Sequence, residues 1–407
     1  MHAHSRVCIS HGLAGVRPCF FATCRLAPGC GLSCNMRWAG ALGHVACPLR
    51  RAFPQGFRWR FAMPPFQCPR CGQTVFFDNT LCGGCGAALG YLPRMRRMSE
   101  ASVDGGLRRC ANHALHGFCN WLLEEPEHSW LCLSCRLTRV SPDLSMAGKL
   151  EAWQKLEAAK KRVVVTLMQL GLTPEPKHSA EDPLGLSFEF LDSQPDASPV
   201  LTGHADGVIT LNMAEADDVY REKARVDFGE PVRNLLGHFR HEVAHYLQYR
   251  WLAGNERAMD RCRAVFGDER ADYASALAAY HQSGPPADWQ TRFISAYASA
   301  HPWEDWAETC AHVLLVLDAV ETAAAWGLRL EGPAATAEPA RAGFRPEVEH
   351  LVVEQWLPVA RFLNAMSRSM GERDPYPFLI PDEVLCKMNT VQKLLREAAT
   401  QYLPGSA

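Results

Sequence analysis

The stretch from Leu235 to Leu252 constrains this chain most, because it reads LLGHFRHEVAHYLQYRWL and sets an HExxH motif inside an unbroken helical pattern. His241 and His245 are four residues apart, which places both imidazoles on one helix face, about 40° apart around the axis. That spacing lets both rings reach one zinc ion at about 2.0–2.1 Å, with Glu242 beside the position that a water would take. The stretch predicts a metal-binding helix. The alternative is an amphipathic helix whose histidines only pack or face solvent.

Size and charge limit the class of protein. The 407 residues are 47% hydrophobic and give room for two or three domains. A net charge of −2 offers no global attraction to nucleic acid or to an anionic membrane, and no run approaches the roughly 18 apolar residues that a membrane helix needs. We therefore expect a soluble protein with neither of these partners.

The 17 cysteines are unevenly spread: six precede Met63, eight lie between Cys68 and Cys135, and three follow. The middle eight have the spacings of metal ligands, so they favour zinc in a reducing compartment over disulfides. We expect a cytoplasmic location on this ground.

Residues 1–62 contain eight Arg, no Lys and no acidic residue, and they show no sustained period. Their composition resembles an organelle transit sequence, although Arg17, Arg25 and Pro28 interrupt every candidate secretory core. We favour a translation start assigned too early, with Met63 opening the protein. The segment is expected to be either such a misassigned start or an unstructured extension.

A first zinc ribbon is predicted over residues 63–98. Each of its CxxC pairs can form a tight turn whose backbone amides point at the thiolates, with Gly72 and Gly86 permitting the turns. A short hairpin through residues 74–77 is expected to join the two turns. The candidate ligands are Cys68, Cys71, Cys82 and Cys85.

A second zinc ribbon is predicted over residues 99–145, with the looser spacing C-x8-C-x12-C-x2-C. Its candidate ligands are Cys110, Cys119, Cys132 and Cys135, and His113 is an alternative to Cys119. Regions this small bury too little apolar surface to fold unaided, so a structural zinc is expected in each ribbon. The basic run at residues 94–97 keeps nucleic-acid binding open, but a run of three arginines is more typical of a solvated linker.

The predicted catalytic domain, residues 146–330, begins with a helix over 147–171, where apolar residues keep to one stripe. Strand patterns follow at residues 186–191 and 207–212. The second strand shortly precedes the HExxH helix, where an extended substrate could add to a sheet edge. A plain core strand is the alternative.

A third metal ligand is expected on the stretch HPWEDWAETCAHVL, residues 301–314, where Pro302 suits the first turn of a helix running to about Gly327. Glu304, Glu308 and His312 lie at i, i+4 and i+8, so they line one face of this helix. Carboxylates on a partly apolar face are costly to bury unless they are paired or metal-bound. Glu304 is the predicted ligand and Glu308 its main competitor; otherwise Glu308 is placed to orient a ligand histidine from behind.

An HExxH followed after a long insert by a helix carrying Glu-x-x-x-Glu resembles the gluzincin peptidases. The segment Tyr297-x6-Glu304-Asp-Trp-Ala-Glu308 is particularly similar to the lethal-factor type, where a Tyr precedes the ligand Glu by seven residues. From about Phe66 to Gly327 the chain also resembles a bacterial family of metallopeptidases that carry zinc ribbons. The features that carry this likeness are CPRCG, CGGCGAALGYLP, CNWL, SCRLTRVSPDLS, LTGHADGVITLNMAEAD, HFRHEVAHY and SAYASAHPWEDWAET.

The resemblance implies a zincin fold with His241, His245 and Glu304 as zinc ligands. It further implies Glu242 as the general base and Tyr297 as a donor to the developing oxyanion. Residues 1–62 lie outside it, and it does not supply a substrate.

A linker over residues 331–343 leads to a C-terminal segment, residues 344–407, in which helices are predicted over 348–366 and 383–402. Pro358 is expected to kink the first of them. The whole chain is thus expected to be α+β: two N-terminal zinc ribbons, a mainly helical zincin-type domain and a helical extension.

The function that these patterns favour is zinc-dependent hydrolysis of a peptide or protein substrate, with one catalytic and two structural zinc ions. One alternative is a non-enzymatic zinc-ribbon protein that binds a protein or nucleic acid and retains the HExxH domain as a scaffold. The intact Glu242 argues against it, because a structural site needs no base. Another alternative is hydrolysis of a non-peptide amide by the same residues.

Overall fold

The structure is a computed structural model that describes residues 65–102, 106–124, 129–193, 200–331 and 348–401. All of them belong to one compact unit of the chain. The predictions for residues 1–62 lie outside the described residues, as does nearly all of the linker predicted over 331–343. Among the helices that are described, none is long and apolar enough to cross a membrane.

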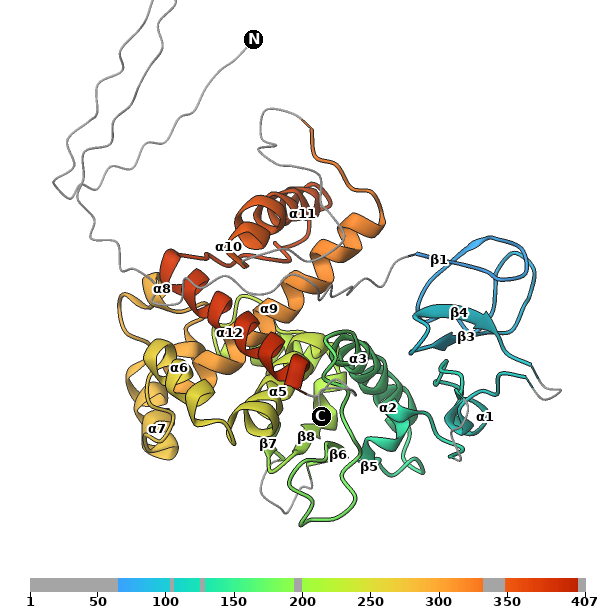
Figure 1. Ribbon diagram of the computed structural model, residues 1–407, viewed down its shortest axis with the longest axis horizontal. Helices are drawn as coiled ribbons and strands as arrows, with labels where there is room; N and C mark the ends of the chain where they lie inside the picture. Colours follow the sequence, from blue (N-terminus) through green and yellow to red (C-terminus); the bar gives the residue numbers. More distant parts are fainter. Residues whose placement is uncertain (1–64, 103–105, 125–128, 194–199, 332–347, 402–407) are drawn as a thin grey trace, which may run out of the picture. The chain divides into compact units, whose positions relative to one another are not determined.

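The first cysteine turns lie among two antiparallel hairpins, β1 (Phe66–Gln67) with β2 (Thr74–Val75) and β3 (Leu89–Leu92) with β4 (Arg97–Glu100) (Figure 1). Gly72 and Gly86 have φ angles of 75° and 68°, the left-handed region that these tight turns require. The hairpin expected over residues 74–77 is placed differently. β2 returns alongside β1 and closes the first turn, instead of joining the two turns.

The segment that follows contains two short helices, α1 (Ala111–His116) and α2 (Leu133–Arg136). It is attached to the first hairpins through backbone hydrogen bonds, since Tyr91 N–H donates to Asn120 O and Leu122 N–H to Tyr91 O. Trp121 between them is fully buried. The two cysteine-bearing segments therefore share one core.

A four-stranded sheet follows, with the order β5 (Thr138–Val140), β6 (Ser187–Leu191), β8 (Val208–Asn212) and β7 (Gly203–Ala205). β5, β6 and β8 run parallel, and β7 runs antiparallel to β8. The expected edge strand over 207–212 is thus an inner strand, and β7 forms the edge. The sheet also crosses residue 145, the expected domain boundary, because β5 pairs with β6.

Asp206 and Gly207 connect β7 to β8 in a two-residue turn, and both have positive φ angles, 49° and 78°. This conformation is the type I′ hairpin turn, which the Asp-Gly sequence favours. The turn explains how a three-residue strand holds its place at the sheet edge.

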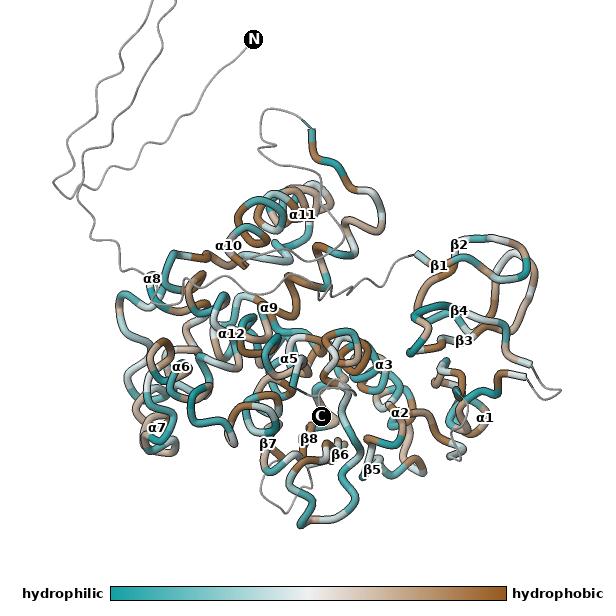
Figure 2. The backbone as a smooth tube through the Cα atoms, viewed as in Figure 1, coloured by the Kyte–Doolittle hydropathy of each residue, from teal (hydrophilic) through white to brown (hydrophobic). Residues whose placement is uncertain are grey.

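Two long helices, α3 (Lys149–Gln169) and α5 (Leu235–Leu247), pack beside the sheet, and a third, α9 (Pro302–Ala325), packs against α5. α5 lies between the other two and also contacts β7. Figure 2 shows hydrophobic stretches along α9 and along the strands β6 and β8. The connecting elements are η1 (Met213–Ala216), α4 (Asp218–Asp227), the π-helical turn η2 (Gln248–Leu252), α6 (Glu256–Phe266), α7 (Tyr273–Ser283), α8 (Trp289–Arg292) and η3 (Tyr297–Ser299).

The C-terminal helices are α10 (Val348–His350), η4 (Leu351–Trp356), α11 (Leu357–Ser369) and α12 (Asp382–Gln401). η4 is a π-helical turn that ends two residues before Pro358. Because proline has no N–H to donate to the preceding turn, a widened turn is a common response of the helix. α12 packs against α9, where Lys387 Nζ lies 2.7 Å from Asp305 Oδ2 and both side chains are buried.

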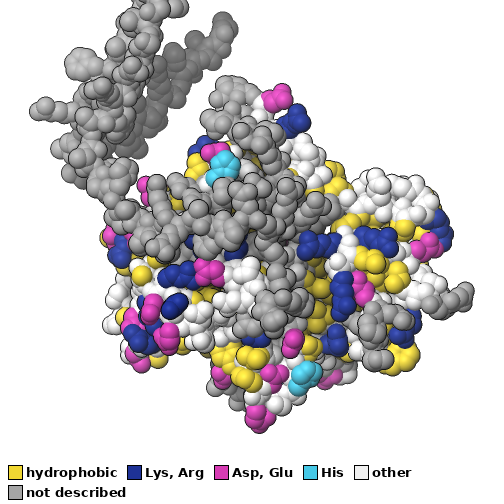
Figure 3. Space-filling view, viewed as in Figure 1, with side chains coloured by type: hydrophobic (Ala, Val, Ile, Leu, Met, Phe, Trp, Pro, Cys, Tyr) yellow, Lys and Arg dark blue, Asp and Glu magenta, His cyan; other side chains and the backbone are white. Residues whose placement is uncertain are grey.

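The α+β class predicted from the sequence is confirmed, with a zinc-ribbon region followed by a largely helical domain. The surface shown in Figure 3 carries Lys and Arg side chains interspersed with Asp and Glu. Several arginines near the hairpins are paired with acids, as in the ion pairs Arg70–Glu100 and Arg162–Asp78.

Candidate metal centre

The described residues contain three groups of side chains that could hold a metal ion, each with ligand atoms within 4.8 Å of one another. The groups are Cys68, Cys71, Cys82 and Cys85; Cys110, Cys119, Cys132 and Cys135; and His241, His245 and Glu304. Each group consists of residues that the sequence predicted as ligands of one zinc ion.

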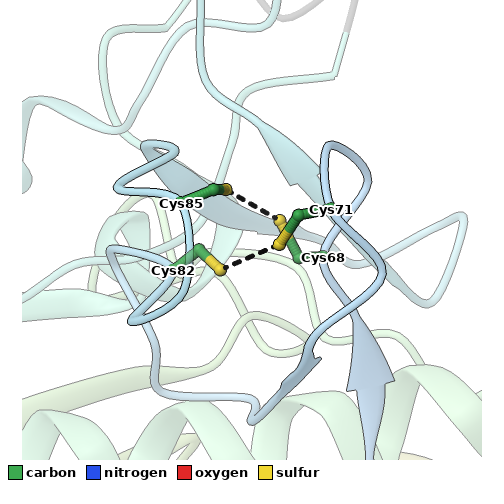
Figure 4. Close-up of side chains that lie close together, drawn as sticks. All are labelled: Cys68, Cys71, Cys82 and Cys85. Atoms are coloured by element: carbon green, nitrogen blue, oxygen red, sulfur yellow. Dashed lines mark hydrogen bonds between the residues drawn. The ribbon is translucent and has the colours of Figure 1, made fainter.

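In the first group, the sulfur atoms of Cys68 and Cys85 are 3.7 Å apart and those of Cys71 and Cys82 are 3.6 Å apart (Figure 4). A disulfide would hold its sulfurs at about 2.05 Å. Four sulfurs at about 2.3 Å from one tetrahedral zinc ion would be separated by about 3.8 Å. The backbone amides of Cys85 and Gly84 lower the pKa of the Cys82 thiol to about 6, which favours the thiolate. The site therefore fits a structural zinc ion.

In the second group all four cysteines are buried. Cys119 Sγ lies 3.7 Å from Cys132 Sγ and 3.6 Å from Cys135 Sγ, again near the edge of such a tetrahedron. The Cys132 N–H donates to Cys110 Sγ at 3.3 Å. The alternative ligand His113 instead has its Nε2 against the Arg109 guanidinium. The structure thus brings together the four thiolates.

The third group arises where α5 packs against α9. Trp306 Nε1–H donates to Ala244 O at 2.8 Å, and the small Ala244 side chain, buried within the HExxH motif, lets α9 approach closely. One turn toward the N-terminus of α5, Arg240 Nη2 donates to Asp318 Oδ2 at 2.6 Å. These two bonds fix the register of the helices, and in this register Glu304 lies opposite the two histidines.

The distances in the third group fit one shared ion. His241 Nε2 and His245 Nε2 are 3.2 Å apart, and they lie 3.0 and 3.7 Å from Glu304 Oε2. Ligand atoms at about 2.0–2.1 Å from a tetrahedral zinc ion would be about 3.3–3.4 Å apart. Glu304 Oε2 is buried and, apart from these two histidine nitrogens, has no polar partner among the described residues. A buried carboxylate oxygen needs a compensating charge, which a metal ion bound by these three residues would supply.

Charge at this site keeps Glu304 ionised. Burial by itself raises the pKa of this carboxyl, but His241 and His245 lower it more strongly, so the net shift is well below the ordinary value. Glu304 is therefore an acceptor only, as a metal ligand must be.

Glu308, the competing candidate, contacts a ligand histidine from the other side. Its Oε1 lies 2.7 Å from His241 Nδ1, and its Oε2 accepts a hydrogen bond of 2.7 Å from Ser295 Oγ. A carboxylate at Nδ1 fixes the ring so that Nε2 faces the ion, and it makes the imidazole more basic. The structure thus separates the two glutamates, with Glu304 among the candidate ligands and Glu308 behind His241.

Glu242, the predicted base, is 7% exposed, and its Oε2 is buried without a hydrogen-bond partner among the described residues. Burial is the main reason that the pKa values of the Tyr273 and Tyr297 phenols lie above the ordinary value. The charge of Glu242 adds to this rise. The predicted donor Tyr297 lies beside His241, with ring centroids 6.2 Å apart. Tyr297 thus lies beside the histidine that directly precedes Glu242 in the motif.

Three residues at the site were missed from the sequence. Tyr273 Oη–H donates to Glu304 Oε1 at 2.8 Å, Ser295 contacts Glu308, and the His204 ring on β7 stacks on His245 with centroids 6.5 Å apart. Each of these residues lies 13 to 41 positions from the residue that it contacts, so no local sequence spacing links the members of a pair. Two of the three lie in motifs quoted above, His204 in LTGHADGVITLNMAEAD and Ser295 in SAYASAHPWEDWAET.

Two four-cysteine clusters followed by a two-histidine, one-glutamate site on packed helices define a zinc-binding class of protein. A model of the family described as "Putative zinc-binding metallo-peptidase" matches residues 149–394, and a zinc-ribbon domain model matches residues 65–146. The chain belongs to this zinc-binding metallopeptidase family. The family match extends through most of α12, so it includes the C-terminal helices.

The curated relatives are mycobacterial. Uncharacterized proteins of Mycobacterium tuberculosis (strain H37Rv) and Mycobacterium bovis are each 42% identical to this chain over 349 residues. The aligned region is 84% of this chain and 98% of each relative. No solved structure matches the chain.

Proposed function

We propose that this protein is a zinc-dependent peptidase in which His241, His245 and Glu304 bind the catalytic ion and Glu242 is the general base. The observation that carries the proposal is the convergence of three ligand atoms on one point. Glu242 follows His241 directly in the same helix, and its Oε2 is buried without a hydrogen-bond partner among the described residues. Two further zinc ions are assigned to the cysteine clusters, which are closed by four thiolates each. Eight thiol ligands also suit a reducing compartment such as the cytoplasm.

Zinc held by three protein ligands supplies an open coordination position, Lewis acidity, and a bound water whose pKa is about 7. The remaining chemistry belongs to the side chains. Glu242 Oε2 is free to accept a proton from the attacking water and to return it to the leaving amine. The Glu308 carboxylate holds His241 in its tautomer through Nδ1. Tyr297 is the candidate donor to the oxyanion that develops on the substrate carbonyl.

A peptide is the favoured substrate class because of the edge strand β7. Among the described residues β7 pairs with β8 alone, and it also contacts α5. Its His204 ring stacks on the ring of His245. An extended peptide can pair with the open edge of such a strand through its backbone, which would carry a carbonyl past the ion. In this proposal β7 is the edge strand with which an extended substrate pairs, a role for which residues 207–212 were the candidate from the sequence alone.

The proposal is tested by digesting an unbiased peptide library with wild type, Glu242→Gln and Glu256→Gln. Glu256→Gln is the matched control, because it makes the same exchange at an exposed position on α6. Loss of a general base is expected to lower the hydrolysis rate about 10²- to 10⁴-fold while the zinc content stays at wild-type level. Full activity of Glu242→Gln on any verified substrate would show that the base is assigned wrongly.

Metal analysis separates the proposal from a non-enzymatic zinc-ribbon protein. Three zinc ions per chain, with one lost in His241→Ala, support a catalytic site. Two zinc ions per chain in both wild type and His241→Ala would support the non-enzymatic alternative, in which the HExxH domain is a scaffold. Zinc-dependent cleavage confined to non-peptide amides would move the protein to a different class of hydrolase.

A further inference from the structure

The helix α7 makes one polar contact with the candidate metal centre, from Tyr273 to Glu304. The Tyr273 hydroxyl donates to Oε1 of Glu304 at 2.8 Å, while Oε2 of the same carboxylate is left for the two histidines. We propose that Tyr273 is a positioning residue that orients Glu304 for zinc, and that α7 and the metal are thereby coupled. The inference rests on the proposed function only in requiring that this site bind zinc.

The division of the two carboxylate oxygens is the first argument. A glutamate has three side-chain torsions, so a free Glu304 could turn either oxygen toward the histidines or swing away from them. Tyr273 occupies one oxygen with a hydrogen bond to a charged acceptor, which is among the stronger kinds of protein hydrogen bond. The other oxygen is then the one that remains for the ion, in the same way that Glu308 fixes the tautomer of His241.

The position of Tyr273 is itself held in place by its neighbours. Its ring packs edge-on against His301, with centroids 5.2 Å apart, and lies 5.5 Å from the ring of Trp303. His301 caps the N-terminus of α9 by accepting the Trp303 N–H at Nδ1, and its Nε2 lies 3.1 Å from Ala271 O. The residues that begin α7 are thus attached to the first turn of α9, the turn that carries Glu304.

The rest of α7 is weakly held, which makes this contact important. Its partly covered residues are spaced at i, i+3, i+4 and i+7, so they form one stripe, and no side chain of α7 is buried. The stripe consists of Tyr273, Ala276, Leu277 and Tyr280. At its far end Tyr280 meets Tyr297 ring to ring, with centroids 5.9 Å apart. A helix without buried side chains has little packing energy of its own, so a single strong contact changes how firmly it is held.

Tyr273 also lies close to the candidate oxyanion donor, since Tyr273 and Tyr297 each affect the pKa of the other. The Tyr273 hydroxyl donates to Glu304. The two tyrosines are therefore assigned separate roles: Tyr273 acts on the ligand, and Tyr297 is the candidate donor to the oxyanion.

The experiment measures zinc affinity by competition with a chelator in the full chain, for wild type and for Tyr273→Phe, Tyr280→Phe and Tyr297→Phe. His241→Ala supplies the background from the two cysteine sites. Tyr273→Phe is expected to weaken zinc binding at this site about 10- to 100-fold, as for other residues that orient metal ligands. Tyr280→Phe is the matched control, since it removes a hydroxyl from the same stripe, and its affinity is expected to stay within twofold of wild type.

Amide hydrogen exchange in α7 supplies a second readout that does not depend on activity. If Tyr273 strengthens zinc binding, zinc must strengthen the attachment of α7 by the same factor. Zinc is therefore expected to slow exchange in α7 of wild type and of Tyr280→Phe, and to have no such effect in Tyr273→Phe.

Wild-type zinc affinity in Tyr273→Phe would overturn the proposal, and so would an equal loss in Tyr280→Phe, which would indicate general packing of α7. A wild-type protein that binds no zinc at His241 would instead overturn the proposed function. The two failures are thus distinguishable.

Discussion

Glu308 offers the sharpest test of how the protein would prepare the proposed metal site, because it contacts a candidate ligand without belonging to the candidate ligand set. It contacts His241 Nδ1 through Oε1 and Ser295 Oγ through Oε2, each at 2.7 Å. Glu308→Gln keeps the length and shape of the side chain and removes its charge. Glu308→Ala removes the contact altogether, so the pair of variants separates charge from geometry.

The expected magnitude follows from two independent estimates. A hydrogen bond to a charged group contributes about 1.5–3 kcal/mol net. Loss of a residue that orients a metal ligand lowers metal affinity about 10- to 100-fold, which is about 1.4–2.7 kcal/mol. Both refer to the same bond, so we expect Glu308→Gln to fall within this range and Glu308→Ala near its upper end. Ser295→Ala removes the bond that supports Glu308, together with the bond that Ser295 Oγ accepts from the Ala298 N–H, and we expect less than a tenfold loss of zinc affinity.

The assay is zinc affinity at this site, measured by chelator competition against the His241→Ala background. A protein that binds zinc only when folded gains stability from that binding, so the loss should recur as a lower unfolding free energy in zinc-saturated samples. Glu256→Gln serves again as a charge-removal control on an exposed helix face. Zinc affinity of Glu308→Gln within twofold of wild type would refute the reasoning that the charge behind His241 tunes the site.

Two further predictions concern stability and the cysteine sites. Lys387→Met leaves Asp305 buried without its partner and should lower the unfolding free energy by about 3–5 kcal/mol, measured by urea denaturation. Burial raises the pKa of Asp305 to about 7, above the unfolded value of about 3.9, so its favourable contribution is present at low pH and is lost as pH rises through about 7. Because Lys387 lowers the pKa of Asp305, removing it extends the loss of this contribution to higher pH. The decrease in unfolding free energy relative to wild type should therefore be larger at pH 8.5 than at pH 6.5, and equal decreases would contradict this. Cys132→Ser should remove one zinc ion and expose residues 106–140 to limited proteolysis while zinc at His241 remains, and unchanged zinc content would count against the second cluster.

The parts of the structure that the sequence predicted well depend on short-range spacing. The CxxC turns require glycine at fixed positions, and Gly72 and Gly86 have the positive φ angles that such turns need. Helical periodicity likewise predicted a helix over residues 147–171, which corresponds to α3 (Lys149–Gln169). In each case the information lies within a few residues of chain, where backbone geometry alone relates sequence to structure.

The arrangement of the sheet was beyond the reach of such patterns. The periodicity of residues 207–212 indicated a strand, but it could not say whether that strand was at an edge or inside. The outcome depends on β7, a three-residue strand that follows residues 200–202 and is too short to give a periodic signal. The participation of β5 in the same sheet depends on parallel pairing with β6, whose paired residues lie 49 and 50 positions further along the chain.

The sequence by itself determined that His241 and His245 share one helix face with Glu242 between them, because the 3.6-residue turn of a helix fixes that relation locally. It also narrowed the third ligand to two glutamates on one face of a second helix. Only the packing of α5 against α9 distinguished them, placing Glu304 at 3.0 Å from His241 Nε2 and Glu308 at 2.7 Å from His241 Nδ1. Tyr273 entered the site in the same way, since a hydrogen bond between residues 31 positions apart depends on how the helices pack and has no counterpart in local periodicity.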